Sequence, residues 1–232
     1  MTSAVIELSE VSKDYRGLRP LRIARLAVEP GEHVAIIGLD QPAAEVFLSL
    51  LTGATLPDRG DIQVFGRPTA SIADSAEWLA FVDRFGIVSE RAVLLEQFSV
   101  IQNLAVPFTL EIEPPPPDVR DRAAALAHEV GIDGPASSRP VGGLDLASRA
   151  RVRLARALAL DPAVLLVEHL SAGMPRRDVK PLGASIRSVA AHRGAALVAA
   201  TADAEFARAI ASRVLVLNPA TGTLSERGRW SR

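Results

Sequence analysis

The sequence predicts an α/β fold built on a mostly parallel, buried sheet, and two observations carry this prediction. Continuous apolar runs recur along the chain, as expected for strands covered on both faces: HVAII at 33–37, AVLLV at 163–167 and AALVAA at 195–200. After the first run the chain passes through Gly38 into a helix-like stretch, AAEVFLSLLTG, that stops at Gly53. A strand, a glycine, a loop and a helix in this order begin a mononucleotide-binding fold.

The remaining elements follow from shorter apolar stretches and the turn residues between them. Further strands are expected at 4–8, 21–27, 57–66 (a turn and then a strand), 85–88 and 213–217. Helices are expected at 75–84, at 119–132 within a helix-rich stretch from about 97 to 150, and at 148–160. Pro114 to Pro117 are interpreted as a stiff, exposed connector ahead of a helix.

Composition excludes several classes of function. The formal net charge of −1 gives no electrostatic reason to expect nucleic acid as a partner. The arginines of 148–160 fall on one helix face, and at this net charge a solvated face is favoured over a phosphate-binding surface. Cysteine is absent, which excludes disulfides and thiolate chemistry. No apolar run reaches the length of a membrane helix and Met1 leads directly into a strand-like stretch, so we expect a soluble protein without an N-terminal signal.

Six segments, taken in order, resemble the ATP-binding cassette of ABC transporters. They are VSKDYRG (11–17), VEPGEHVAIIG (28–38), LTGATLPDRGDIQVFGR (51–67), FSVIQNLAVPF (98–108), RVRLARALALDPAVLLVEHLSAG (151–173) and the closing RVLVLNPATGTLSERG (213–228). The resemblance implies one cassette over 1–232, with a P-loop NTPase-like core at about 1–95 and 150–232. It also implies an antiparallel β edge on the mostly parallel sheet and a helical lobe inserted at about 96–150.

The stretch that matches the phosphate-binding P-loop, G-x-x-x-x-G-K-[ST], runs from Gly38 to Glu45. Only its first glycine remains. The second glycine is Ala43, the lysine is Ala44 and the magnesium-binding hydroxyl is Glu45, while Pro42 removes a backbone N–H. The lost lysine alone removes an interaction of about 4 kcal/mol at about 4 Å and an effective dielectric of about 20. Glu45 is expected either to act as a built-in anion in the first turn of the helix or to point into solvent.

The other positions of the ATP site are altered as well. By the resemblance, Glu168 aligns with the Walker B aspartate and could still reach a metal, and His169 aligns with the catalytic glutamate. We expect a packing or hydrogen-bonding role for His169, because a general base is of little use where phosphate is not held. Asp145 aligns with the signature serine, Glu90 with the Q-loop glutamine and Ala202 with the switch histidine.

Tyr15 is the one ligand-contacting side chain that remains as the family has it, and it either stacks on adenine or serves packing. In the family, two cassettes clamp two nucleotides head to tail, and each site combines the Walker motifs of one chain with the signature of the other. Because this chain departs from both, the leading hypothesis is a pseudo-ATPase with no catalytic residue, metal or cofactor. It would act at the cytoplasmic face of the membrane, bound to a permease and a second cassette.

Two alternatives stay open. One is an ATP-hydrolysing transport subunit that binds ATP with magnesium and uses Tyr15, Glu168 and His169 in unusual roles. The other is a signalling or DNA-repair cassette without a transporter, which the chain length disfavours.

Overall fold

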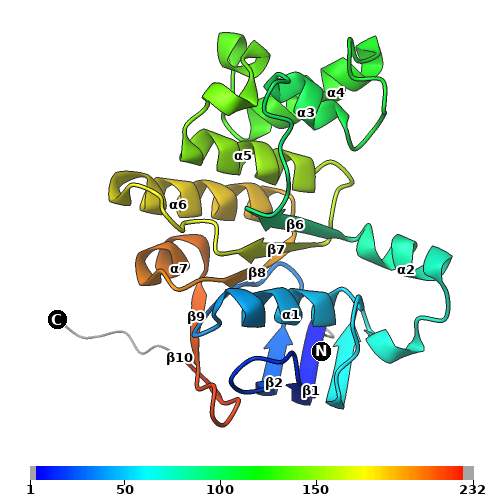
Figure 1. Cartoon of the computed structure of the whole chain (residues 1–232), viewed down its shortest axis with the longest axis vertical. Coiled ribbons are helices and arrows are strands. Elements are labelled where there is room, and N and C mark those ends of the chain that lie inside the picture. Colours follow the sequence, from blue (N-terminus) through cyan, green and yellow to red (C-terminus); the bar gives the residue numbers. More distant parts are fainter. Residues whose placement is uncertain (1–3, 227–232) are drawn as a thin grey trace.

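The computed structural model of the protein describes residues 4–226. Residues 227 and 228 of the segment that resembles the closing hairpin lie outside this range, as does Met1, on which the expectation about a signal rests. The larger of the two sheets has six strands (Figure 1). In spatial order they are β10 (Leu224–Glu226), β9 (Arg213–Leu217), β3 (His33–Ile37), β8 (Ala196–Ala200), β7 (Val164–Glu168) and β6 (Phe85–Ser89).

All neighbours in this sheet are parallel except β10, which returns antiparallel to β9 in a hairpin. The three apolar runs form β3, β7 and β8, and each is buried on both sides of the sheet. Because parallel strands end at the same edge, the loops that follow β3, β6, β7 and β8 meet there. In an open α/β sheet this edge is where ligands bind. Of the aligned residues, Gly38, Glu90, His169 and Ala202 closely follow these strands, whereas Tyr15 and Asp145 come from other segments.

The antiparallel strands form a sheet of their own beside the parallel one (Figure 1). In spatial order its strands are β2 (Leu21–Val28), β1 (Ile6–Lys13), β4 (Arg59–Val64) and β5 (Arg67–Pro68). The first strand is longer than the predicted 4–8 because its pairing with β2 continues to Lys13.

Seven α-helices and three short 3₁₀ turns complete the described part of the chain. They are α1 (Gln41–Leu51), η1 (Thr69–Ser71), α2 (Ser75–Val82), α3 (Val100–Ala105), α4 (Pro117–Glu129), η2 (Gly134–Ser138), η3 (Val141–Gly143), α5 (Leu146–Ala157), α6 (Arg176–His192) and α7 (Ala204–Ile210). Helices α3, α4 and α5 gather at one end of the molecule (Figure 1). Within residues 4–226, no helix is both long and apolar enough to cross a membrane.

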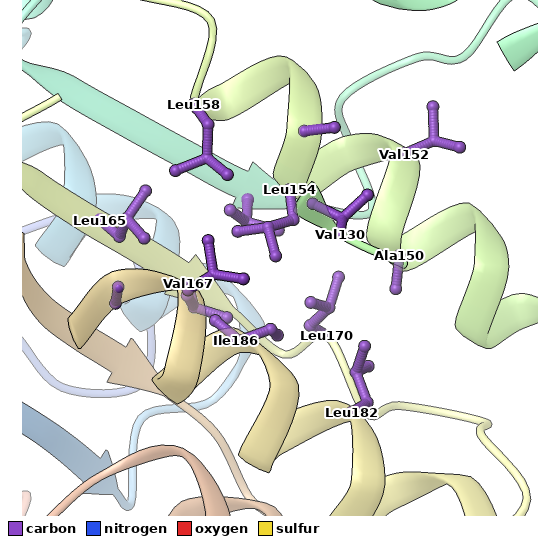
Figure 2. Close-up of a cluster of buried hydrophobic side chains, with 14 of the residues drawn as sticks. Val130, Ala150, Val152, Leu154, Leu158, Leu165, Val167, Leu170, Leu182 and Ile186 are labelled. Atoms are coloured by element: carbon purple, nitrogen blue, oxygen red, sulfur yellow. The ribbon is translucent and has the colours of Figure 1, made fainter. Parts of the chain in front are cut away.

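The parallel sheet separates two apolar cores, because successive side chains of a strand point to opposite faces. On one face, Leu165 and Val167 of β7 pack with the helices α3 to α7. Figure 2 shows part of this cluster, in which side chains of α5 and α6 meet β7. On the other face, Val164 and Leu166 pack with α1 and the antiparallel sheet. Helix α1 therefore lies between the two sheets, with its first turn at the ligand-binding edge.

Candidate functional site

The loop between β3 and α1 is short and tightly placed. Since β3 ends at Ile37 and α1 begins at Gln41, only Gly38, Leu39 and Asp40 lie between them. Gly38 has a φ of +108°, and a Cβ atom there would lie 2.8 Å from the carbonyl oxygen of Leu217. Only glycine suits both the backbone conformation and the close approach. The surviving glycine of the motif is thus explained by packing, without any ligand.

The negative charge at the N-terminus of α1 comes from Asp40. Its carboxylate is the N-cap of the helix and accepts a hydrogen bond from the N–H of Ala43 at 2.9 Å. Pro42 in the first turn supplies no N–H. Fewer backbone N–H groups are therefore left to bind a phosphate: Pro42 has none, and the N–H of Ala43 already donates to Asp40.

The expectation that Glu45 fills this position is wrong. The helix begins at Gln41, two residues before the predicted start, so Glu45 lies beyond the first turn. Its carboxylate oxygen lies 3.4 Å from Nε of Arg91, and the side chain is 39% exposed. Glu45 thus pairs with a cation and does not accept from the N–H groups of the loop.

Ala43 and Ala44 contribute to the core. Both are buried, Ala44 completely, among the apolar side chains between α1 and the two sheets. At the position where the family has its phosphate-binding lysine, the structure therefore has a packing residue.

Glu168 ends β7 and is the most constrained acid of the site, because its side chain is 0% exposed. One carboxylate oxygen accepts from Nε2 of Gln41 at 2.8 Å. The other accepts from the guanidinium of Arg91, at 2.7 Å from Nη2 and 3.2 Å from Nε. A buried carboxylate is stable only when it is paired and hydrogen-bonded, and here both oxygens are engaged. A metal ion at Glu168 would have to share these oxygens with the two donors or displace them, and it would meet the positive charge of Arg91.

Arg91 was not predicted from the sequence. It follows Glu90 in the loop after β6, and its N–H donates to Oγ of Ser89 at 3.1 Å. The aligned Glu90 is exposed, whereas the guanidinium of its neighbour points between Glu45 and Glu168. The one available signal was indirect: a glutamate at the end of a fully buried strand requires a cation nearby.

His169 follows Glu168 with a φ of +43°, a left-handed conformation that is uncommon for residues other than glycine. Its N–H donates to the carbonyl oxygen of Ala200 at 2.9 Å. Its buried Nε2 has no hydrogen-bond partner among the described residues. The backbone bond would form with any residue except proline here, so the hydrogen-bonding role expected of the side chain is not seen at this ring nitrogen, and the packing role stays a prediction.

Three of the predicted positions meet around one cavity of about 250 Å³. Its lining includes Glu90, Glu168 and His169, together with Gln41 and Arg91. The resemblance implies a magnesium–nucleotide complex here, and the side chains do not fit it. A guanidinium lies between the acids, and among residues 4–226 no group of three or more His, Cys, Asp or Glu side chains is arranged to hold a metal ion.

Tyr15 lies in a different cavity, of about 760 Å³, whose lining includes Gly38, Asp40 and Ala43. The ring packs partly against the core between the sheets, and Gly17 lies so close that a Cβ there would be 2.6 Å from the ring. Burial raises the pKa of the Tyr15 hydroxyl, and the nearby charge of Asp40 raises it further. The half-buried ring thus serves packing and also borders an open, largely apolar cavity.

Asp145 is the N-cap of α5 and lines neither of these cavities. Its carboxylate accepts from the N–H of Ser148 at 2.7 Å. Hydrogen bonds from Ser148 lower the pKa of Asp145, and the charges of Arg151 and Arg177 lower it further. A local role, the start of a helix, accounts for an acid at this position.

Ala202 lies on the other side of His169, in a cavity of about 300 Å³ that His169 also lines. The next residue, Asp203, is the N-cap of α7 and forms an ion pair with Arg176 at 2.7 Å. No titratable side chain therefore replaces the switch histidine at position 202 itself.

The arginines of α5 are not a solvated face, contrary to the prediction. Arg153 donates to the carbonyl oxygens of Glu90 and Ala92, and Arg156 donates to that of Val93 at 2.6 Å. Burial lowers the pKa of both guanidinium groups. The helix thus holds the backbone of the loop that carries Arg91.

Comparison with known proteins agrees with this fold. The profile of the family described as "ABC transporter" matches residues 21–169. The methionine import ATP-binding protein MetN of Brucella abortus (strain 2308) is 29% identical over 98% of the chain, and the chain spans only 60% of its length. The lipoprotein-releasing system ATP-binding protein LolD 1 of Rhodopirellula baltica is 29% identical, with 97% of this chain and 98% of that protein covered.

Solved structures show the same architecture. CbiO1 from Clostridium perfringens, part of the ABC transporter complex cbiONQ, superposes with a TM-score of 0.80 at 20% identity over 96% of this chain and 87% of that one. The ATP-binding cassette MJ0796, in a dimeric state bound to ADP and Pi, superposes with a TM-score of 0.74 at 19% identity over 97% and 100% of the two chains. Because the profile spans more than half of the 232 residues, this chain belongs to the ABC transporter family.

Proposed function

We propose that this chain is a cassette-shaped subunit of a membrane transport complex in which it acts as a pseudo-ATPase, with a structural or regulatory role. The observation that carries the proposal is the state of Glu168. Both oxygens of its fully buried carboxylate are engaged, by Gln41 and by Arg91, at the position where a nucleotide-bound metal would be held. Ala44 and Pro42 remove the lysine and one N–H of the phosphate site.

The relatives support the transport setting. MetN and LolD are named for import and for lipoprotein release, and CbiO1 is part of a transporter complex. We therefore expect a permease as partner, contacted from the cytoplasmic face of the membrane. A second cassette is expected as well, since MJ0796 forms a dimer. In this proposal residues 1–232 are a single cassette, with a helical lobe at about 96–150 that contains α3 and α4 and the start of α5.

Titration with a fluorescent ATP analogue tests the proposal. We expect weak binding that neither magnesium nor a chelator changes, because the cation of Arg91 already lies between Glu45 and Glu168. Tyr15→Ala is the matched control: it reports contact with the base and leaves the metal position untouched. Binding that magnesium tightens at least about tenfold, and that Glu168→Gln abolishes, supports the ATP-hydrolysing alternative instead.

A further inference from the structure

Two acids from separate segments contact the guanidinium of Arg91, which lies in the loop after β6. Glu45 belongs to α1, and Glu168 ends β7. Nε of Arg91 lies 3.4 Å from a carboxylate oxygen of Glu45 and 3.2 Å from one of Glu168. Two acids from different elements therefore share one cation.

Burial makes this cation necessary. The Glu168 side chain is 0% exposed, while Arg91 is 50% exposed and keeps part of its hydration. An ionised carboxylate without a partner is strongly disfavoured at such a depth. Among the described residues, Arg91 is the only basic side chain that forms an ion pair with Glu45 or Glu168. Gln41 adds one neutral hydrogen bond but no charge.

We propose that Arg91 is a resident cation, a permanent internal substitute for a metal ion between α1 and β7, with Glu45 and Glu168 as its ligands. This inference rests on the proposed function and goes further, because it states what fills the cation position. The site then has its positive charge at all times, independent of nucleotide. The backbone of the same loop is held by Arg153 and Arg156, which donate to its carbonyl oxygens.

The first test is a double-mutant cycle on thermal stability. Arg91→Ala leaves Glu168 buried and unpaired, and we expect the melting temperature to fall by about 5 °C or more. Glu168→Gln in the same chain removes the orphan charge and is expected to restore most of the loss. The matched control is Arg67→Ala, which breaks the partly exposed ion pair with Glu77 at 2.6 Å and should change stability little.

The second test is chemical rescue. Millimolar guanidinium, which restores the missing cation, should raise the melting temperature of Arg91→Ala while leaving the wild type and Arg67→Ala unchanged. Stabilisation of Arg91→Ala alone by Mg²⁺ or Mn²⁺ also supports a cation position. If Arg91→Ala does not fold, a folded Arg91→Ala/Glu168→Gln double variant supports the proposal.

Three outcomes overturn the resident cation. The first is a fall in melting temperature for Arg91→Ala no larger than for Arg67→Ala. The second is a melting temperature that does not recover when Glu168→Gln is added, and the third is a double variant that fails to fold. None of them depends on ATP. Hydrolysis by the wild type contradicts the proposed function instead, so the two failures are distinguishable.

Discussion

Two aspartates, Asp40 and Asp145, occupy helix N-termini that the family uses to bind phosphate. Each accepts a hydrogen bond from an N–H of its own helix, from Ala43 and from Ser148. A carboxylate in this position satisfies a free N–H and interacts favourably with the helix dipole. It also places a negative charge where an anionic ligand would approach. At the residue scale, the proposed loss of phosphate binding thus has a local cause, because the side chains that start the helices would repel an anion.

The contribution of Asp145 is testable through pH. Asp145→Ala is expected to cost about 1 kcal/mol of unfolding free energy at neutral pH, from loss of the N-cap. Because the folded pKa of Asp145 lies below its unfolded value, the carboxylate stabilises the protein fully above about pH 3.9. This contribution is lost as the pH falls through the folded pKa, so the cost of the substitution shrinks there. Urea unfolding measured at several pH values follows the change.

Asp145→Asn is the matched control for that series, since asparagine also caps helices but does not titrate. At neutral pH, Asp145→Asn should lower the unfolding free energy only slightly, because the cap hydrogen bond is kept and only the interaction of the charge with the helix dipole is lost. An Asp145→Ala cost that stays constant across the acid range contradicts the role given to the carboxylate.

At the scale of elements, α5 and the loop after β6 act together. The guanidinium groups of Arg153 and Arg156 bind three loop carbonyls, those of Glu90, Ala92 and Val93. Backbone carbonyls that are satisfied in this way stay ordered even in an irregular segment. The loop consequently presents Arg91 to Glu168 in one defined position.

Replacing both arginines with methionine should loosen this loop while α5 stays intact, because methionine is also a good helix former. We expect amide hydrogen exchange between residues 90 and 98 to become about tenfold faster or more, as for the loss of at least one net hydrogen bond to a charged group. Arg120→Met, at an exposed position of α4, is the control. Unchanged exchange in the loop, with the fold intact, contradicts the holding role of α5.

Element boundaries also explain what the sequence could and could not predict. The buried strands β3, β7 and β8 were predicted within one residue at either end, because apolar runs covered on both faces leave a clear pattern. The start of α1 was placed at Ala43 although Asp40, with Pro42 two residues later, is a helix start signal. That shift of two residues is what placed Glu45 in the first turn and led to the wrong role for it.

The contacts of Arg91 and of the α5 arginines do not follow from the sequence, for a different reason. Their partners are backbone carbonyls and acids that lie far away in the sequence, such as Glu168 for Arg91. A helical pattern with arginines on one face looks the same whether solvent or another segment covers that face. Only the folded chain shows that a loop lies against α5.

At the scale of the whole molecule, the ABC transporter fold is intact, while the two acids Glu45 and Glu168 at the position aligned with its ATP site are paired with Arg91. Two apolar cores enclose the parallel sheet, and α1 lies buried between the sheets. The fold therefore does not depend on nucleotide for its packing. The proposed pseudo-ATPase would keep the shape of the family's cassette even though several positions of the site are changed.

We therefore expect that no single substitution at an aligned site position confers ATP hydrolysis. His169→Glu supplies the aligned general base, but Ala44, Pro42 and the Arg91–Glu168 pair remain. We expect phosphate release from ATP to stay at background in this variant, since a base cannot act where the phosphate is not held. Magnesium-dependent phosphate release by His169→Glu would contradict this expectation, because it would mean that the other changed positions do not prevent hydrolysis.

ATP hydrolysis by the wild-type protein decides whether this chain is a pseudo-ATPase. The measurement is release of radiolabelled phosphate from ATP with magnesium, over long incubation, beside folded Glu168→Gln at the same concentration. The account predicts equal, background release from both proteins. Magnesium-dependent release by the wild type that is lost in Glu168→Gln contradicts it.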